Sequence, residues 1–389
     1  MKNNTLFTLL LSVFIAFLGI GIIIPIMPVF ATELGAGGLG LGMIIAAFSI
    51  TRGVLLPVVG NLSDRWGRKS FLAAGLLIYG AVGLLIPLAE SVSNLVVIRS
   101  FHGVGSAMIV PIAMAYISLL TPAGHESRYM SYLNIAIFCG IGCGPIIGGI
   151  IYDIFGFAEV FHLMALLSFA AFILVLLQMP PHISSDTAPP PALLTSMKSM
   201  LRSKKTSGIL LARYATMIIM VPTMAFLPLI MADWENVSGL QIGIVIAGRT
   251  LVNAMLQVPF GKLSDRYNKF TILITGSGCL ALTVFCIPWM RNFHEMLGLY
   301  LILGAVEAAV WAVLGGYASI EAKKHYGHGT MMGVFSLAMS GGVFTGAVLA
   351  GLGMDILGIR YAYIISSATV ILLSLLAAKM IHSHPNKVP

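Results

Sequence analysis

A single acidic residue, Glu307, lies near the middle of a long apolar run, in the sequence GAVEAAVW. A charged side chain at the centre of a membrane costs about 2.5–3.5 kcal/mol on insertion scales, so such a residue marks a functional site by default. A carboxylate held away from water can bind and release a proton near neutral pH, or it can anchor a substrate. The alternative role for Glu307 is structural, as the partner of a buried arginine.

Basic residues also occur inside apolar runs, and they outnumber the acid. The four arginines are Arg52, Arg99, Arg213 and Arg249. This excess of positive charge favours recognition of an anionic or zwitterionic substrate, with pairing to backbone carbonyls as the alternative. His102, one turn after Arg99, is a candidate partner or titrating group, or a neutral packed side chain.

Substrate contacts are expected from polar residues in the same apolar runs. We predict this role for Arg52, Arg249, Arg213, Tyr116, Asn134, Tyr214, Asn253, Gln257 and Tyr317.

The sequence gives no reason to expect a metal site. The methionines in ATMIIMVPTMAF have helical spacing in an apolar segment, which indicates packing rather than a copper site. The four cysteines show no disulfide or zinc spacing, so no metal site is expected.

The elements that must position these residues are membrane-spanning helices. The chain has 389 residues, of which 58% are hydrophobic and only 9% charged. Its mean hydropathy is +0.97. Apolar runs of about 18 or more residues predict spanning helices. Such runs predict twelve spans, near 5–31, 38–59, 71–89, 93–119, 128–155, 157–178, 208–231, 238–260, 270–289, 294–318, 329–355 and 360–382. The shortest interruptions are at Gly156 and Gly358, and without them the count falls to ten.

The net charge of +8 has a topological explanation. When both termini are placed in the cytoplasm, most basic residues face inward, and only Arg291 and Arg360 lie in outer loops. The charge therefore gives no reason to expect a nucleic-acid partner. It predicts a multi-pass protein of the lipid bilayer with cytoplasmic termini.

The sequence divides into two halves that repeat. A Pro-rich and then basic segment at 180–207 separates residues 1–179 from residues 208–389, and each half holds six predicted spans. The phrases GNLSDRWGRKS, from Gly60, and GKLSDRYNKF, from Gly261, lie at an offset of 201 residues. We therefore predict an N-terminal six-helix bundle, a cytoplasmic linker and a C-terminal six-helix bundle. Parallel repeats of this kind build transporters that bind substrate at the bilayer midplane.

The repeated phrase predicts a cytoplasmic gate. A carboxylate between two helices can accept hydrogen bonds from helix-terminal amides, where the helix dipole favours negative charge. Neighbouring arginines can bridge to acids or to helix C-termini, so the cluster can latch and release. Ordinary positive-inside charges are the alternative. The predicted gate residues are Gly60, Asp64, Arg65, Gly67, Arg68, Asp265 and Arg266. Because Asn268 replaces the glycine in the second copy, we expect the second latch to be weaker.

Small residues in the predicted fifth span favour close helix packing. Gly140, Gly144 and Gly148 recur every four residues, with Pro145 and Gly149 beside them. This spacing permits close helix contact, and the proline bends the helix. We predict a seam between the two bundles, with plain tight packing of a membrane helix as the alternative.

Four motifs together resemble those of the major facilitator superfamily, and of its twelve-helix drug/proton antiporters in particular. GNLSDRWGRK resembles the signature of the loop between helices 2 and 3, RSFHGVGSA the fourth-helix signature, LGIGIIIPIMP the first-helix signature and GIGCGPIIGGIIYDIFG the fifth-helix signature. The resemblance spans the whole chain. It implies an all-α fold of two six-helix bundles and a role for Arg99 in assisting proton transfer, so we group Arg99 and His102 with Glu307 as proton-coupling residues.

These observations predict a secondary active transporter rather than an enzyme. No nucleotide-binding motif is visible, so no cofactor is expected beyond the proton gradient as the energy source. We expect a proton-coupled exporter of a small amphipathic drug or metabolite, and the excess of arginines favours an anionic one. The protein is expected to act as a monomer in the inner membrane. A symporter or exchanger of an organic anion is one alternative, and a non-transporting receptor is another.

Overall fold

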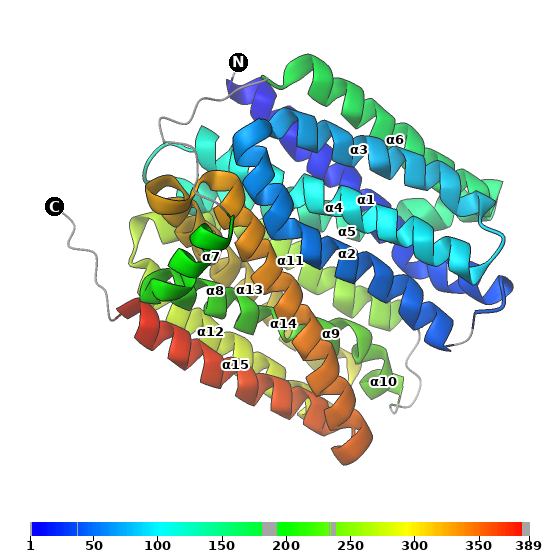
Figure 1. The fold of residues 1–389 in the computed structure, drawn as a ribbon. Helices are drawn as coiled ribbons and strands as arrows, with labels where there is room; N and C mark the ends of the chain where they lie inside the picture. Colours follow the sequence, from blue (N-terminus) through cyan, green and yellow to red (C-terminus); the bar gives the residue numbers. More distant parts are fainter. Residues whose placement is uncertain (1, 37, 181–192, 233, 235–238, 383–389) are drawn as a thin grey trace. The chain divides into compact units, whose positions relative to one another are not determined.

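The structure is a computed structural model, and it describes residues 2–36, 38–180, 193–232, 234 and 239–382. Within these ranges the chain is helical (Figure 1). The long helices of the first half are α1 Lys2–Glu33, α2 Gly38–Trp66, α3 Arg68–Leu85, α4 Val92–Leu120, α5 Glu126–Phe155 and α6 Phe157–Gln178. Helix α7 Leu193–Arg202 and the start of α8 lie within the predicted linker 180–207. The helices from there on are α8 Lys204–Met217, α9 Met220–Ala225, α10 Leu227–Ala232, α11 Gly239–Arg266, α12 Lys269–Cys286, α13 Phe293–Glu321, α14 His328–Leu357 and α15 Ile359–His382.

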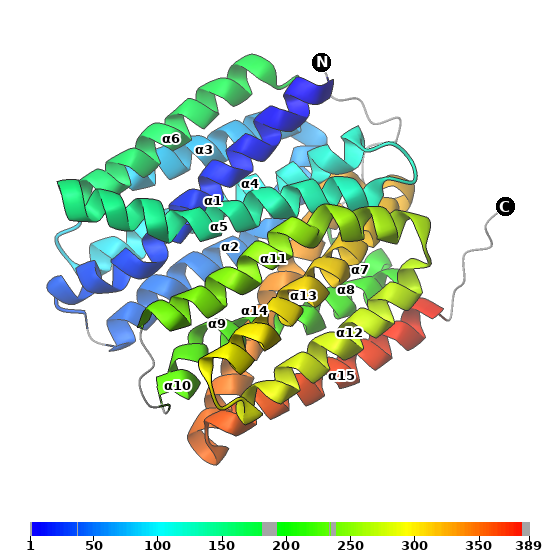
Figure 2. The same cartoon turned by 180° about the vertical axis from the view of Figure 1, so that it is seen from behind.

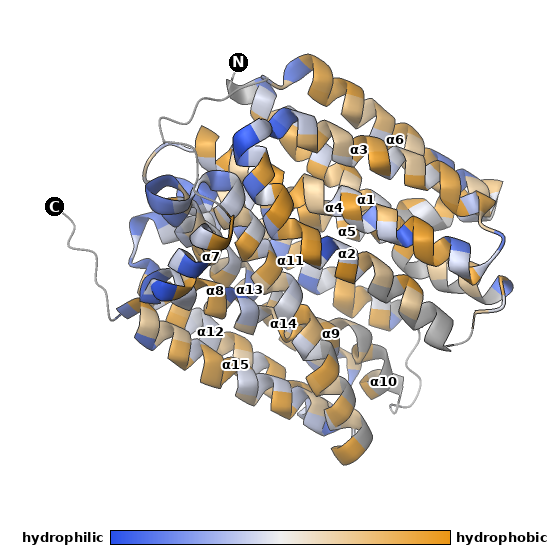
Figure 3. Ribbon diagram, in the orientation of Figure 1, coloured by the Kyte–Doolittle hydropathy of each residue, from blue (hydrophilic) through white to orange (hydrophobic). Residues whose placement is uncertain are grey.

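The helices have the length and composition of membrane spans. Among the described residues, ten helical segments are long and apolar enough to cross a membrane. Together with α2 and α5, which are 29 and 30 residues long, they account for the twelve predicted spans. Figure 3 shows apolar residues along the long helices and hydrophilic ones gathered toward helix ends. The predicted all-α membrane fold is confirmed.

The two short interruptions that decide the span count are helix breaks. Helix α5 ends at Phe155 and α6 begins at Phe157, while α14 ends at Leu357 and α15 begins at Ile359. Gly156 and Gly358, which separate them, have φ angles of 96° and 98°. Residues with a side chain rarely adopt this left-handed region, so glycine permits each sharp break.

The seventh predicted span, 208–231, is broken where a continuous helix was expected. Helix α8 ends at Met217, and two further short helices, α9 and α10, follow it. Pro222 lacks an amide hydrogen, and in a regular helix its ring would clash with the carbonyl four residues earlier. That carbonyl belongs to Ile218, which lies at the first break, between α8 and α9. Broken helices at membrane depth are tolerated where protein surrounds them or where they line a cavity.

By their internal contacts, residues 1–121, 132–193 and 322–336 form one compact unit, unit 1. Residues 122–131, 194–321 and 337–389 form the other, unit 2. Each unit therefore includes a short segment from the other half of the sequence, a detail absent from the predicted division into 1–179, 180–207 and 208–389. The linker residues 181–192 lie outside the described ranges.

The two units repeat the same helix packing. In unit 1, α4 packs on α2 and α3, and α6 packs on α3 and α1 (Figures 1 and 2). In unit 2, α13 packs on α11 and α12, and α15 packs on α12 and α8. The short 3₁₀ turns Ile86–Leu88 and Ile287–Trp289 also lie at the 201-residue offset. The structure thus carries the repeat seen in the sequence.

Candidate functional site

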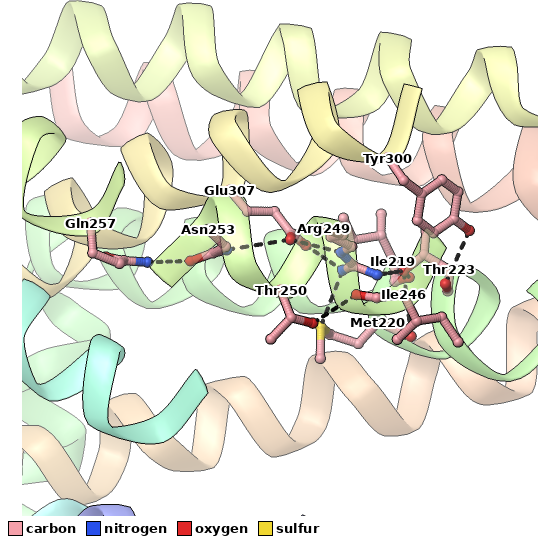
Figure 4. Close-up of polar contacts among 10 residues, drawn as sticks. All are labelled: Ile219, Met220, Thr223, Ile246, Arg249, Thr250, Asn253, Gln257, Tyr300 and Glu307. Atoms are coloured by element: carbon pink, nitrogen blue, oxygen red, sulfur yellow. Dashed lines mark hydrogen bonds and ion pairs between the residues drawn. The ribbon is translucent and has the colours of Figure 1, made fainter. Parts of the chain in front are cut away.

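An ion pair between Arg249 of α11 and Glu307 of α13 is the centre of the polar network in unit 2 (Figure 4). Arg249 donates through Nε to Oε2 of Glu307 at 2.9 Å and through Nη2 to Oε1 at 2.5 Å. Both side chains are at least 97% buried. The two parallel bonds are the bidentate geometry that guanidinium and carboxylate groups favour.

Close packing of α11 on α13 makes this pairing possible. A Cβ on Gly304 would clash with the carbonyl of Arg249, so only glycine allows the two backbones to approach there. Glu307 follows Gly304 by three residues, about one turn along the same helix face. The glycine therefore places the carboxylate against the guanidinium.

The broken seventh span supplies the remaining partners of Arg249. Nη1 donates to the hydroxyl of Thr223 at 2.7 Å, and Nη2 lies 3.7 Å from the sulfur of Met220. Thr223 in turn donates to the carbonyl of Ile219 at 2.6 Å, and its own carbonyl accepts from the hydroxyl of Tyr300 at 3.0 Å. No polar role was predicted for Thr223 or Tyr300, and the sequence signal for Thr223 is its place between two prolines in an apolar span.

Asn253 and Gln257 extend the network along α11, as expected for predicted site residues one and two turns beyond Arg249. Gln257 donates to Oδ1 of Asn253 at 2.6 Å, and the amide of Asn253 lies 3.5 Å from Oε2 of Glu307. Both residues are fully buried. The structure thus brings together four of the predicted site residues in one chain of hydrogen bonds.

The two predicted site residues of α8 lie against α13 and α14. The guanidinium of Arg213 lies 4.9 Å from the ring centroid of Trp311 and donates to the sulfur of Met339 at 3.1 Å. Tyr214 shares a 2.5 Å hydrogen bond with the hydroxyl of Thr345. Stacking on an indole face is a favourable environment for a guanidinium that is largely desolvated.

A second buried cluster lies in unit 1 around Arg99. Its Nη1 lies 2.7 Å from Nδ1 of His102, and its guanidinium stacks over the Phe48 ring at 4.5 Å. His102 is fully buried, with its ring edge-on to Tyr79 at 4.4 Å. Arg52, which lies on α2, interacts electrostatically with Tyr79. Two aromatic residues that the sequence analysis did not single out, Phe48 and Tyr79, complete this cluster.

Two other predicted substrate contacts, Tyr116 and Tyr317, lie far along their helices from these two clusters. Tyr116 is 17 residues beyond Arg99 on α4, about 25 Å along the helix axis, and its hydroxyl donates to the carbonyl of Pro180 at 3.5 Å. Tyr317 lies 10 residues beyond Glu307, about 15 Å along α13. Asn134 is half-buried on α5.

The carboxylate of the first gate phrase caps a helix. Asp64 accepts from the backbone amides of Gly329 and Thr330, both at 2.8 Å, at the start of α14. It also accepts from the Thr330 hydroxyl at 3.1 Å and from Arg68 at 2.5 Å. These are orphan amides of a helix N-terminus, where negative charge is most favourable. All of these contacts lie inside unit 1.

The second phrase repeats the arrangement in unit 2. Asp265 accepts from the amides of Ser127 and Arg128 at the start of α5, both at 3.0 Å, and from Lys269 at 3.3 Å. The expected weakening is not visible in the number of amide bonds, which is two in each copy. Gly67 has a φ of 94°, whereas Asn268 has a φ of −65° and caps the amide of Phe270 at 2.9 Å.

The other predicted gate residues divide into two groups. Gly60 is buried where a Cβ would clash with Gly329, and Gly261, its equivalent in the second copy, is buried where a Cβ would clash with Ser131. Both glycines let the motif approach the helix start that its aspartate caps. Arg65 and Arg266, by contrast, are exposed. The glycines and aspartates therefore share one contact, and these two arginines lie outside it.

The glycine face of α5 has a different partner from the one predicted. A Cβ on Gly140 would lie 2.7 Å from the carbonyl oxygen of Phe14, and one on Gly144 would lie 2.6 Å from Cα of Gly21. Gly148 faces Ile22. These partners belong to α1, inside unit 1, so the structure corrects the predicted seam between two bundles. Spacing alone predicted close contact without naming the partner. The surroundings of Pro145 and Gly149 lie outside those described.

Replacing Gly144 with alanine is expected to lower the unfolding temperature of the purified protein. The new methyl group would lie 2.6 Å from the backbone of Gly21, and such overpacking costs about 1–3 kcal/mol. Gly148→Ala is the matched control, because its Cβ would first meet a side-chain atom of Ile22 at 3.3 Å. Thermal unfolding in detergent measures both variants. Equal unfolding temperatures would contradict the α1–α5 contact.

Comparison with known proteins agrees with the fold and the repeated phrases. The family described as the Major Facilitator Superfamily matches residues 9–234 and 209–389. An uncharacterized MFS-type transporter of Methanocaldococcus jannaschii is 28% identical over 379 residues, which are 96% of this chain and 97% of that protein. Multidrug resistance protein 2 of Bacillus subtilis is 29% identical, over 95% of this chain and 94% of that protein.

A solved structure supports the same fold. The human organic anion transporter MFSD10 superimposes with a TM-score of 0.85, over 97% of this chain and 99% of that chain, at 16% sequence identity. This likeness agrees with the fold expected from the sequence motifs. Two matched halves, two repeated helix-capping aspartates and this likeness together establish that the chain belongs to the major facilitator superfamily of multi-pass membrane transporters.

Proposed function

We propose that this transporter exports a small amphipathic drug or metabolite in exchange for protons. The observation that carries the proposal is the buried pair of Arg249 and Glu307, the one acid that the sequence places near the centre of a span. An intramembrane carboxylate is expensive, and such groups mark ion and proton pathways. The Bacillus subtilis relative named for multidrug resistance supports a drug-like substrate.

In the proposed cycle, Glu307 alternates between two partners. Deprotonated, it accepts both hydrogen bonds from Arg249, and the pair is neutral as a whole. Protonated, it loses most of its attraction for the guanidinium, which leaves Arg249 with Thr223 and Met220 on the broken seventh span. Proton binding thus changes the contacts between α11, α13 and α9. Arg99 and His102 are proposed to assist proton transfer in unit 1.

The two aspartate caps are proposed to act as a cytoplasmic gate. Each cap joins the last turn of the second helix of one half to the start of the fifth helix of the other half. Opening toward the cytoplasm would break these amide bonds, and closing would form them again. In this scheme alternating access consists of a rocking motion of the two six-helix bundles.

The remaining features of the proposal follow from charge placement. Basic residues concentrated in predicted inner loops support the proposal that both termini lie in the cytoplasm. The proposed location is the inner membrane, where a proton gradient supplies the energy. The protein is proposed to act as a monomer and to need no cofactor. A symporter or exchanger of an organic anion is the second candidate, because the cationic cluster of unit 1 favours negative charge.

Gradient-driven accumulation in proteoliposomes tests the proposal. Wild-type protein is reconstituted with an acidic lumen, and a panel of fluorescent lipophilic cations, zwitterions and carboxylates is offered outside. We expect at least one compound to accumulate in exchange for lumenal protons, and accumulation to stop when an ionophore collapses the pH gradient. Accumulation that requires an acidic exterior would favour the symporter. Flux indifferent to the gradient would rule out proton coupling.

A further inference from the structure

The two units differ in how they neutralise their buried arginines. At the 201-residue offset, Arg249 and Glu307 of unit 2 correspond to Phe48 and Ser106 of unit 1. The alignment also holds in space, because a Cβ on Gly304 would meet the Arg249 carbonyl and one on Gly103 the Phe48 carbonyl. Unit 1 therefore has no carboxylate at the position where unit 2 has its acid.

Unit 1 nevertheless has two arginines at this level. Arg52 lies one turn after Phe48 on α2, and its backbone nitrogen would be 3.1 Å from a Cβ on Gly103. Arg99 lies one turn before Gly103 on α4. The charges of both arginines act on the hydroxyl of Tyr79, which is hydrogen-bonded to Ser106. Arg52 and Arg99 thus lie on two contacting helix turns and interact with the same tyrosine.

The polar atoms left over in this cluster are all donors. Because a guanidinium can only donate, the 2.7 Å contact from Arg99 makes Nδ1 of His102 the acceptor and puts the proton of the neutral ring on Nε2. This Nε2, Nε of Arg52 and Nε of Arg99 are buried and have no hydrogen-bond partner among the residues that the structure describes. Arg99 and His102 are 92% and 100% buried.

A cluster with two positive charges, whose buried unpaired polar atoms among the described residues are all donors, is complementary to an anion. Unpaired buried donors are costly, and unpaired charges in a membrane are more so. Within the described part of the chain, no carboxylate forms an ion pair with Arg52 or Arg99. Aromatic rings of Phe48 and Tyr79 surround the cluster, which suits an anion attached to an apolar body.

From this geometry we infer that Arg52, Arg99 and His102 form a subsite for the anionic group, a carboxylate in the simplest case, of an amphipathic organic substrate. The inference rests on the proposed function in that the bound molecule is the transported one. It adds a task to unit 1: unit 2 holds the protonation pair, and the residues that are proposed to assist proton transfer in unit 1 also select the charge of the substrate.

Ligand pairs that differ only in charge test the inference. Benzoate, naphthalene-2-carboxylate and anthracene-9-carboxylate are each compared with their primary amides, by equilibrium dialysis against the full-length protein in nanodiscs of neutral lipid. We expect at least one carboxylate to bind the wild type at least tenfold tighter than its amide. Arg52→Gln should weaken carboxylate binding by about tenfold to a hundredfold, as for one lost charge-assisted hydrogen bond, and leave amide binding unchanged.

Two further variants separate charge from structure. Arg52→Lys retains the charge and should keep part of the carboxylate preference, because a lysine acts as a point charge without the planar fork. Arg360→Gln, at an exposed arginine at the start of α15, is the matched control and should bind like the wild type. Unchanged amide binding and an unchanged unfolding temperature show that Arg52→Gln is folded.

The outcomes that would overturn the inference are distinct from failure of the proposed function. Equal binding of carboxylate and amide, equal loss of both in Arg52→Gln, or no binding of any carboxylate would contradict the subsite. Sulfate that binds as tightly as the best carboxylate would contradict an organic ligand. Glu307→Gln should keep the carboxylate preference even though proton coupling is lost, so each claim can fail while the other holds.

Discussion

Replacing Glu307 with glutamine is expected to abolish substrate accumulation driven by a pH gradient. Glutamine cannot release a proton, and it cannot form an ion pair with Arg249. Gradient-driven uptake in proteoliposomes should therefore fall to the level of empty liposomes, while downhill exchange of substrate continues. Glu321→Gln is the matched control on the same helix. That acid is also buried and paired, with Lys205 at 3.0 Å, but lies 14 residues away from the network, and coupling should survive its loss.

A second variant separates coupling from stability. Removing one partner of a buried ion pair costs about 3–5 kcal/mol, because the other charge stays buried without compensation. Glu307→Gln should therefore unfold at a lower temperature, and Arg249→Met with Glu307→Gln should regain much of the loss. The double variant should still be uncoupled. Gradient-driven accumulation by either variant would contradict the role of Glu307.

Replacing Asp64 with asparagine is expected to slow transport about tenfold or more, the second large effect. One oxygen of Asp64 becomes an NH₂ group, so a donor then faces one of the two amide donors at the start of α14. Hydrogen bonds to a charged group are worth about 1.5–3 kcal/mol each, and a shift of that size changes the balance of two conformations at least tenfold. Initial rates of uptake at saturating substrate measure the effect.

Two further variants test whether the slower transport comes from the loss of the helix cap. Arg65→Gln changes an exposed neighbour of the cap and should alter the rate by much less. Asp265→Asn removes the equivalent cap at the start of α5 and should act in the same direction as Asp64→Asn. An unchanged rate in both aspartate variants would mean that the caps contribute to stability without gating.

Sequence patterns predicted what depends on local chemistry. The repeat was visible in the paired phrases, and the breaks at Gly156 and Gly358 followed from single glycines between apolar runs. An acceptor role for Asp64 at helix-terminal amides also followed from the charge of a helix N-terminus. Each of these features depends on a few consecutive residues and on a known conformational or electrostatic preference of those residues.

The sequence alone did not predict which helices, distant in the chain, contact one another. Arg249 and Glu307 are 58 residues apart, and only the rotation of α11 against α13 brings them together. The glycine spacing of α5 predicts a close neighbour but does not select α1 over any other helix. The seventh span is mostly apolar and was predicted as one helix, although Pro222 lies within it. Its break, which delivers Thr223 to Arg249, was therefore not predicted. Helix rotation and kinks depend on packing partners, which a single sequence does not specify.

The most direct test of proton exchange counts protons while substrate moves. Proteoliposomes loaded with a pH-sensitive dye receive a transported compound from outside, with no pH gradient and with the membrane potential clamped by potassium and valinomycin. Exchange predicts that entry of the compound makes the lumen more alkaline in wild type and in Glu321→Gln, and leaves it unchanged in Glu307→Gln. Entry of the compound into wild-type vesicles with no change in lumenal pH would contradict the account.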